Sequence, residues 1–388
     1  MTEPFLPYGR QVIEDDDVAA VARALRSDFL TTGPEVAAFE AEFAQAVGAA
    51  HAVACINGTA ALHIAMLALG VGEGDVCIVP STTFLATANC ARYVGAEVVF
   101  ADVNPATGLM GPEHLAAAMD RLGGRRLAAV LPVHLRGEVV DLPALAALAE
   151  RRGAVLVEDA CHALGSVHTA AGGETPVGSC RWSAASTFSF HPVKTIATGE
   201  GGMVTTHDAA LAERLRLARS HGMVRPEGGD PWWYEMPEPG FNYRLPDILC
   251  ALGRSQLAKL PRFARARRDL AAAYEDRLAD LAPQVQVAGR PAWSVSVPHL
   301  MSVLIDFEGL GVGRAEVIAA LRAQGIGAQV HYIPVHQQPY YRQRYGDLDL
   351  PGAQAWYERT LSLPLYPGLD EGDVDRVADA LAKALRLA

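Results

Sequence analysis

The sequence lacks the features of secreted, membrane-spanning and zinc-binding proteins. Its six cysteines are scattered along 388 residues, with no CxxC pair and no His/Cys spacing typical of zinc ligands. We therefore expect buried thiols in a reducing compartment and no metal site. The first residues, MTEPFLPYGRQVIEDDD, contain no basic-then-apolar signal, and no apolar run approaches the roughly 18 residues of a membrane span. These absences predict a soluble cytoplasmic protein without a membrane partner.

Positive charge is also scarce. The formal net charge is −11 at pH 7, and acids and bases are interspersed without a basic stripe. Nucleic acids and anionic membrane surfaces attract positively charged faces, so neither is an expected partner. The sequence has no internal repeat and no low-complexity segment. Half of its residues are apolar, which is enough for a large core.

Short β-rich runs alternate with helical patterns through most of the chain. This alternation predicts an α/β fold with a mostly parallel sheet covered by helices on both faces. Helices are expected at 34–47 and 59–69, because apolar residues of the second recur at spacings of three and four. The expected strands are HAVACI (51–56), VCIVP (76–80), AEVVFAD (96–102), LAAVLPV (127–133), AVLVED (154–159), STFSF (186–190) and GGMVTT (201–206).

The pattern changes after residue 253. A long amphipathic segment follows, and a break is expected near Pro261 because proline interrupts a helix. We therefore predict a large domain over 1–253 and a smaller α+β domain over 254–388. The smaller domain contains the apolar run HLMSVLIDF (299–307), an expected strand at GAQVHYI (327–333) and expected helices from about 314, at 351–360 and at 371–387.

Polar residues follow several expected strands at their carboxyl ends, where ligands bind in open α/β sheets. Gly58 and Thr59 come after the first strand and open a helix, and a helix N-terminus with a free hydroxyl suits a phosphate. An ordinary capped helix after a glycine turn explains the same two residues. Asp159 ends another strand, where it is either a buried, paired carboxylate or a helix cap.

Lys194 lies in the stretch SFHPVKTIATGEGG, directly after the strand that ends near Ser189. The lysine precedes the glycines, so this is not a phosphate loop of the GxxxxGK type, and an ATPase is excluded. A phosphate-binding helix end, a carboxylate and a lysine together match the needs of pyridoxal 5′-phosphate (PLP). Its ring also needs a platform, for which Phe84 is a candidate, although a core phenylalanine is the alternative.

Nine stretches in order along the chain resemble the DegT-type sugar-nucleotide aminotransferases, which are PLP enzymes of fold type I. This resemblance implies a mostly parallel mixed sheet flanked by helices and a smaller C-terminal α+β domain. Within the family, the pattern is most similar to that of transaminases of pseudaminic acid biosynthesis. The stretches are SDFLTTGPEVAAFE, NGTAALHIAMLALGVGEGD, TFLATANC, PVHLRGE, EDACHALGS, SFHPVKTIATGEGG, RSHGM, GFNYRLPDI and VHYIPVHQQPYY.

The resemblance assigns roles to matching positions around the cofactor ring. Lys194 matches the lysine that forms the Schiff base and acts as the catalytic acid and base. Asp159 matches the partner of the pyridine nitrogen, and Phe84 matches the ring platform. His162 matches a residue beside the cofactor that approaches its 3′-oxygen. His191 either points at the sugar or supports the loop.

Other matching positions concern the phosphate, the substrate and a second subunit. Gly58, Thr59 and Ser189 match phosphate contacts, and His331 matches a substrate-side histidine. Asn242 matches an asparagine that reaches the PLP phosphate of the neighbouring subunit, so the resemblance implies a homodimer with shared active sites. The implied substrates are L-glutamate and a nucleotide sugar, a UDP-4-keto-6-deoxy-N-acetylhexosamine aminated at C4.

Three alternatives stay open at this point. The first is an aminotransferase for another UDP- or dTDP-linked 3- or 4-keto-deoxysugar, because Arg136 and Glu138 depart from the family pattern. The second is the dehydratase branch of the family, which has histidine at the lysine position and which Lys194 disfavours. The third is a non-catalytic PLP-binding regulator, which the lack of a DNA-binding region or basic arm disfavours.

Overall fold

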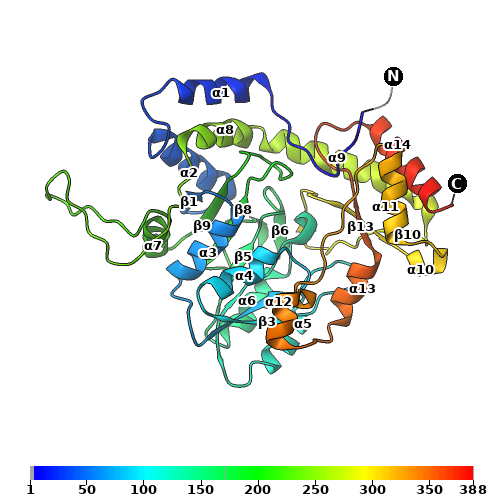
Figure 1. The fold of residues 1–388 in the computed structure, drawn as a ribbon, viewed down its shortest axis with the longest axis horizontal. Helices are drawn as coiled ribbons and strands as arrows, with labels where there is room; N and C mark the ends of the chain where they lie inside the picture. The colour runs from blue at the N-terminus through cyan, green and yellow to red at the C-terminus, as the bar shows by residue number, and fades with distance from the viewer. Residues whose placement is uncertain (1–3, 171, 388) are drawn as a thin grey trace.

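A seven-stranded mixed sheet forms the centre of the chain. In the computed structural model, which describes residues 4–170 and 172–387, the strand order is β1-β9-β8-β5-β4-β2-β3 (Figure 1). Only β9 runs antiparallel to its neighbours, so all other strands of this sheet share one direction. The bounds are β1 His51–Cys55, β2 Asp75–Pro80, β3 Glu97–Ala101, β4 Arg126–Val130, β5 Val155–Asp159, β8 Ala185–Ser189 and β9 Gly202–Thr206.

Helices cover both faces of this sheet because successive strand residues point to opposite sides. In β1, Ala52 and Ala54 pack with α2, α5, α6 and α8, whereas Val53 and Cys55 pack with α3, α4 and α7. The helix α1 lies against α8 at the top of Figure 1. The bounds are α1 Asp15–Leu25, α2 Pro34–Val47, α3 Gly58–Ala68, α4 Leu85–Tyr93, α5 Pro112–Asp120, α6 Leu142–Glu150, α7 Ala209–Arg219 and α8 Asp247–Ala258.

All seven strands expected in the first part of the chain are confirmed, as is the mostly parallel sheet between helices. Most bounds shift by one residue, while β4 ends at Val130 rather than at 133. The helix expected at 34–47 is α2, and the helix expected at 59–69 is α3, which begins one residue earlier at Gly58. Short continuous apolar runs revealed these strands, because a strand buried on both faces has apolar residues on both sides.

A second core lies at the C-terminal end of the chain, to the right in Figure 1. The helix α8 ends at Ala258 and α9 begins at Leu260, which confirms the expected break near Pro261. A three-stranded sheet in the order β10-β12-β13 packs against α9, α11 and α14. The bounds are α9 Leu260–Leu278, β10 Val285–Val287, β12 Met301–Ile305, α10 Phe307–Leu310, α11 Arg314–Ala323, α12 Pro339–Tyr345, α13 Pro351–Arg359, β13 Thr360–Leu363 and α14 Glu371–Ala384.

Several segments after residue 254 pack onto the large core. The strand β11 (Ser294–Val295) pairs with β6 (Val167–Ala170), which in turn pairs with β7 (Gly173–Pro176). Tyr341 of α12 and Trp356 of α13 are buried among residues of the large core. The division into domains 1–253 and 254–388 therefore stays a prediction, and these segments of the second part pack against the first.

The strand expected at 327–333 is wrong. Only an isolated bridge between Gln329 and Ser362 forms there. The backbone of this segment bonds to unrelated parts of the chain instead: the Gly327 N–H donates to Leu6 O, and the Trp356 indole donates to His331 O. A strand needs one continuous neighbour, and this segment lacks it.

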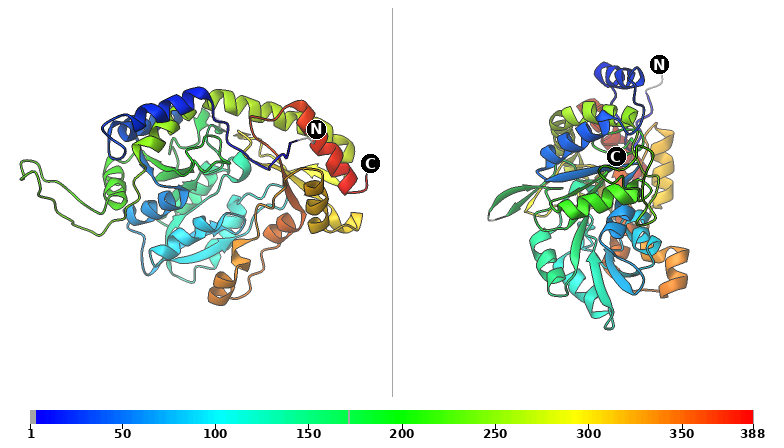
Figure 2. Two further views of the ribbon diagram at one scale, coloured as in Figure 1. Left: turned by 45° about the horizontal axis from the view of Figure 1, so that its top comes forward. Right: turned by 90° about the vertical axis from the view of Figure 1, so that its left-hand side faces the viewer.

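The segment between α7 and α8 extends away from the body of the protein, to the left in Figure 1 and in the left view of Figure 2. We call residues 223–240 the arm. Its chain doubles back through a bridge between Val224 and Glu235, and the segment that this bridge encloses includes the exposed side chains of Trp232, Trp233 and Tyr234. Exposed aromatic side chains grouped in this way are unusual on a protein surface that contacts only solvent. Across residues 4–170 and 172–387, no helix has the length and apolar character needed to cross a bilayer.

Candidate active site

The carboxyl ends of β1, β2, β4, β5 and β8 meet at one edge of the main sheet, where open α/β sheets bind ligands. A cleft of about 660 Å³ opens at this edge and extends to the segment 329–333 of the C-terminal part. Every predicted site residue except Asn242 lines the cleft: Gly58, Thr59, Phe84, Asp159, His162, Ser189, His191, Lys194 and His331. The topology thus brings together residues that lie far apart in the sequence.

The N-terminus of α3 forms one wall of the cleft. Asn57 caps this helix, since its side chain accepts from the Ala60 N–H, so the cap is not Thr59. Gly58 lies against Ser189: a Cβ added at Gly58 would approach the Ser189 Cβ to 2.9 Å. The first N–H groups of a helix have no intrahelical acceptor, and here two hydroxyl-bearing residues stand beside them. This wall is suited to an anion such as a phosphate.

Lys194 lies in the turn that follows β8 and lines the cleft. The turn is held by the bond from the Lys194 N–H to His191 O and by the bond from the Ala197 N–H to the side chain of Gln256. Burial lowers the pKa of the Lys194 amine, although Cys161 and Asp159 act in the opposite direction. A lysine in this setting loses its proton more readily than an exposed one.

Asp159 is buried at the end of β5 and is fixed by donors at both carboxylate oxygens. The Thr87 hydroxyl donates to Oδ2 at 2.6 Å, and the Cys161 N–H donates to Oδ1 at 3.2 Å. The Thr87 hydroxyl has one proton and donates it to Asp159. In the 2.7 Å contact between the hydroxyls of Thr83 and Thr87, the donor is therefore Thr83. The carboxylate therefore has a set orientation and keeps lone pairs for a ligand in the cleft.

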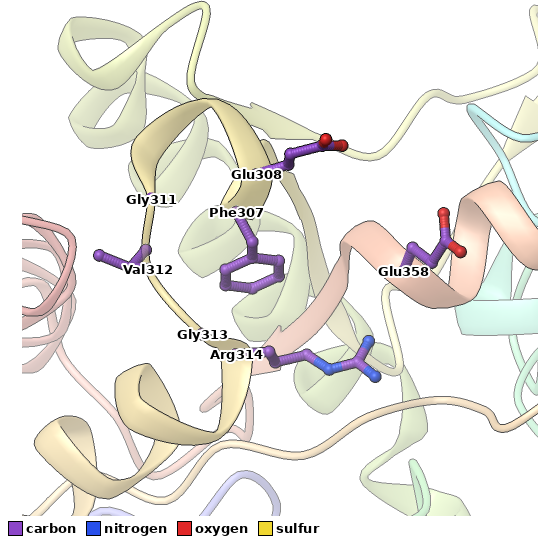
Figure 3. A pocket seen from close by; sticks show the side chains of 7 residues that line it. All are labelled: Phe307, Glu308, Gly311, Val312, Gly313, Arg314 and Glu358. Carbon is purple, nitrogen blue, oxygen red and sulfur yellow. The ribbon is translucent and has the colours of Figure 1, made fainter.

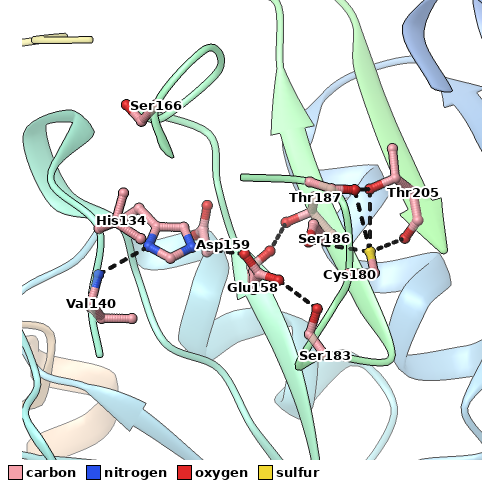
Figure 4. Close-up of polar contacts among 12 residues, drawn as sticks. His134, Val140, Glu158, Asp159, Ser166, Cys180, Ser183, Ser186, Thr187 and Thr205 are labelled. Carbon is pink, nitrogen blue, oxygen red and sulfur yellow. Dashed lines mark hydrogen bonds and ion pairs between the residues drawn. The ribbon is translucent and has the colours of Figure 1, made fainter. Parts of the chain in front are cut away.

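Glu158, the residue before Asp159, belongs to a separate network (Figure 4). Its carboxylate contacts His134 Nε2 at 2.9 Å and accepts from the Ser183 hydroxyl. Adjacent residues of a strand point to opposite faces, so only Asp159 of the pair reaches the cleft. Glu158 is therefore a buried carboxylate of the same strand that serves as a matched control for Asp159.

Replacing Thr87 by valine should reduce turnover about 10-fold and weaken cofactor affinity, because one donor to a buried carboxylate is lost at nearly constant volume. Steady-state kinetics and PLP titration of the apoprotein measure the two effects. Thr360→Val is the control, since the buried Thr360 hydroxyl has no partner among the described residues. Equal behaviour of the two variants would show that the Thr87 bond to Asp159 has no role in the cleft.

Phe84 and His191 lie at the cleft opening. The ring of Phe84 is 54% exposed, which rules out a core phenylalanine, and its centroid is 6.1 Å from that of Tyr332. His191 is also exposed and lines the cleft, so its position is compatible with either of the roles considered from sequence. Phe84 is thus available as a surface on which a flat ligand could stack.

Two histidines of the cleft wall are buried and neutral. Burial, the nearby Lys194 charge and His331 lower the pKa of His162 well below its ordinary value. Burial and Lys194 lower the pKa of His331 to about 3, and its Nδ1 lies 2.9 Å from the Ser362 hydroxyl. Both rings therefore act through hydrogen bonds and not through charge at neutral pH.

Three residues singled out from sequence lie elsewhere. Asn242 is exposed and forms a bridge with Ser220 near the base of the arm. Arg136 is buried, and its guanidinium donates to Thr107 O and Gly289 O. Glu138 lies 3.3 Å from Arg290. Neither Arg136 nor Glu138 lines the cleft, so their departure from the family pattern does not alter its walls.

Sequence reasoning missed Tyr8, Thr87 and Tyr332. Tyr8 and Tyr332 line the cleft, and Thr87 stands behind Asp159. Tyr332 follows His331 directly, so its adjacency to a predicted substrate residue was a usable signal. No local signal indicated Tyr8, which reaches the cleft because the N-terminal segment pairs with Ile326 through Leu6.

A second hollow lies on the C-terminal part, between α10 and α13 (Figure 3). Phe307, Glu308, Arg314 and Glu358 surround it. The Arg314 guanidinium is already used, because it contacts Tyr357 O and stacks on the Tyr357 ring. This open depression contains no convergent set of groups, and none of the predicted site residues.

The cleft residues fit PLP. Gly58, Thr59 and Ser189 could hold its phosphate, Asp159 its ring nitrogen and Lys194 its aldehyde, with Phe84 beside the ring. A mostly parallel sheet flanked by helices, with this set of groups at its carboxyl edge, defines a class of protein: a PLP-dependent aminotransferase of fold type I.

Comparison with known proteins gives the family. The model of the DegT/DnrJ/EryC1/StrS aminotransferase family matches residues 11–382. The chain is 39% identical to the spore coat polysaccharide biosynthesis protein SpsC of Bacillus subtilis (strain 168), over 97% of this chain and 96% of that protein. The chain therefore belongs to the DegT/DnrJ/EryC1/StrS family, and it is a PLP-dependent sugar-nucleotide aminotransferase.

Solved structures agree with this assignment. PseC of Helicobacter pylori, an aminotransferase involved in the biosynthesis of pseudoaminic acid, is 29% identical with a TM-score of 0.89, over 98% of this chain and 99% of that one. The PLP form of the putative sugar aminotransferase Spr1654 from Streptococcus pneumoniae is 26% identical with a TM-score of 0.88, over the same shares. The cofactor expected from sequence is thus the cofactor found in a structural relative.

Proposed function

We propose that the enzyme moves an amino group from L-glutamate to C4 of a UDP-4-keto-6-deoxy-N-acetylhexosamine, in the cytoplasm. The observation that carries this proposal is the convergence of Lys194, Asp159 and the N-terminus of α3 on one cleft in a chain of this family. The specific sugar rests on the likeness to PseC, whose described role is in pseudoaminic acid biosynthesis.

In this proposal, bound PLP supplies an aldehyde that condenses with amines and a ring that accepts an electron pair. The Lys194 amine would hold the cofactor aldehyde in the resting enzyme and, once glutamate has taken that place, would take up and return the proton of the glutamate α-carbon. This task requires an unprotonated amine, and burial lowers the pKa of Lys194 accordingly. The Asp159 carboxylate would keep the ring nitrogen protonated, while Thr59 and Ser189 would hold the phosphate.

A second candidate substrate is another UDP- or dTDP-linked keto-deoxysugar destined for a surface polysaccharide. The 39% identity to SpsC, a protein of spore coat polysaccharide biosynthesis, favours it. Both candidates use the same cleft and the same lysine. They differ in the sugar, and hence in the residues of 329–333 and of any second subunit that contact it.

We also propose that the enzyme is a homodimer with shared active sites. Two features support this proposal. The arm exposes the large apolar side chains of Trp232 and Trp233, and Asn242 is exposed near the base of the arm. A second copy of the chain packed against this surface would cover both features. Asn242 does not line the cleft of its own chain, so in this proposal it reaches the phosphate bound to its partner.

Asn242→Ala should weaken PLP affinity about 10-fold, because a hydrogen bond to a charged phosphate is lost from the neighbouring site. Equilibrium titration of the apoprotein with PLP, followed by absorbance, measures the change. At a PLP concentration too low to saturate Asn242→Ala, mixing it with the inactive Lys194→Ala variant should restore part of the activity, since mixed dimers contain one intact site. No change in affinity and no restoration would contradict sharing of the site.

The proposed reaction is tested in two halves. Adding L-glutamate to the yellow, PLP-loaded enzyme should bleach its colour and release 2-oxoglutarate, which a non-catalytic PLP binder would not do. Supplying UDP- and dTDP-linked 4-keto and 3-keto hexoses of both C5 configurations, with mass detection of the aminosugar, then identifies the acceptor. Bleaching without turnover of any UDP-4-keto-6-deoxy sugar would overturn the specific proposal while leaving the aminotransferase intact.

A further inference from the structure

Tyr332 stands at the centre of the cleft wall between three predicted site residues. Its ring lies 4.8 Å from that of His331 in an edge-on arrangement and 6.1 Å from those of His162 and Phe84. Its hydroxyl lies 3.2 Å from His162 Nε2. Burial is the main cause that raises the pKa of the Tyr332 phenol, so the group stays protonated. A phenol that lines the cleft therefore keeps its proton available.

The other nitrogen of His162 fixes the direction of the bond to Tyr332. The Arg136 N–H donates to His162 Nδ1 at 3.3 Å, so Nδ1 is an acceptor and carries no proton. A neutral imidazole then has its proton on Nε2, and Nε2 donates to the Tyr332 oxygen. The doubly protonated ring is excluded, because its Nδ1–H would face the Arg136 N–H. A ring without protons would be an anion, which burial opposes.

Two consequences follow for the cleft. Both nitrogens of His162 are engaged by the protein, so this histidine has no free hydrogen-bonding group for a ligand. The Tyr332 oxygen accepts from His162, and its own O–H has no other partner among the residues that the structure describes. The direct approach of His162 to the 3′-oxygen of PLP stays a prediction, and the available donor at this wall is the phenol.

We propose that Tyr332 is a ligand-binding residue that donates its phenolic proton to an electron-rich oxygen in the cleft, and that His162 is its positioning residue. This inference rests on the proposed function. The oxygen is either the 3′-oxygen attached to the cofactor ring or an oxygen of the keto-sugar, and either of them can accept a hydrogen bond from the same O–H donor. The geometry favours the 3′-oxygen of the cofactor, since the phenol stands beside Phe84, the expected ring platform.

Tyr332→Phe removes the hydroxyl and keeps the ring against His331 and Phe84. If the oxygen is the cofactor's, the variant should bind PLP about 10-fold more weakly, and the absorbance maximum of the loaded, substrate-free protein should shift. If the oxygen is the sugar's, absorbance and PLP affinity should stay unchanged while the KM for the sugar rises about 10-fold. PLP titration of the apoprotein, absorbance spectra and kinetics separate the two sources.

His162 is tested by a pair of variants. His162→Gln can accept from the Arg136 N–H and donate to Tyr332, so it should retain the wild-type spectrum and PLP affinity. His162→Leu offers neither bond and should reproduce the change seen in Tyr332→Phe. A purely structural role would damage both variants in step with their thermal stability, and that pattern would overturn the positioning role.

Tyr340→Phe is the matched control, because Tyr340 is exposed outside the cleft and its hydroxyl only accepts from Arg92. The inference fails if Tyr332→Phe matches this control in spectrum, PLP affinity and sugar KM while the wild-type enzyme is bleached by glutamate. Absence of bleaching in the wild type would instead overturn the proposed function. The two failures are therefore distinguishable in one set of measurements.

Discussion

Replacing Lys194 by alanine should abolish the yellow colour of the PLP-loaded protein and reduce turnover by at least about 10⁴-fold. The reason is that one amine performs two tasks, holding the aldehyde of the cofactor and moving the proton at the α-carbon of glutamate. Absorbance spectroscopy and the glutamate half-reaction measure the two losses independently. Thermal unfolding should change little, because the Lys194 side chain has no hydrogen-bond partner among the described residues.

The small number of lysines in the chain makes it simple to identify the lysine that binds the cofactor. The chain contains three lysines, Lys194, Lys259 and Lys383, and only Lys194 lines the cleft. Lys259 is held by Glu14, Asp16 and Asp17, and Lys383 is exposed on α14. Borohydride reduction of the loaded enzyme should attach the cofactor to the peptide of Lys194 alone. Attachment to another peptide, or normal turnover by Lys194→Ala, would refute the assignment, while Lys383→Ala should behave as wild type.

The pH dependence of the reaction follows from the same residue. Burial lowers the pKa of Lys194, so the amine loses its proton at a lower pH than an exposed lysine and remains reactive closer to neutrality. The cleft histidines do not oppose this by charge, because the pKa of His331 is lowered to about 3. The single-turnover rate with glutamate should therefore rise with pH and level off below the ordinary lysine pKa of about 10.4.

The position of the site was predictable because it depends on strand ends. Asp159 and Ser189 terminate strands whose apolar runs are visible in the sequence, and parallel strands must deliver their carboxyl ends to one edge. The partners of these residues were not predictable by the same reasoning. Thr87 is 72 residues from Asp159, and Tyr332 is 170 residues from His162. Such contacts depend on how helices and loops pack, which periodicity does not encode.

The role of charged residues outside the cleft was also beyond sequence reasoning. Arg136 and Glu138 follow the strand predicted over 127–133, and their departure from the family pattern would have put the identity of the sugar in doubt had they been near it. The structure turns Arg136 toward backbone carbonyl oxygens and over the Trp356 ring. A strand end thus specifies an edge of the sheet, but the rotation of the following turn decides which side chains enter the cleft.

Replacing Asp159 by asparagine should leave much of the bound cofactor and reduce turnover about 100-fold to 1,000-fold. The amide has nearly the same size but no negative charge, so it no longer favours a protonated ring nitrogen, on which acceptance of the electron pair depends. Stopped-flow bleaching by glutamate measures the loss.

Glu158→Gln makes the same change at the preceding buried carboxylate, which contacts His134 and Ser183 on the opposite face of β5. That control should lower the melting temperature and keep the bleaching rate, because its network does not reach the cleft. Similar rates for both variants would mean that charge at the end of β5 acts through folding, and the pairing of Asp159 with the ring nitrogen would have to be abandoned.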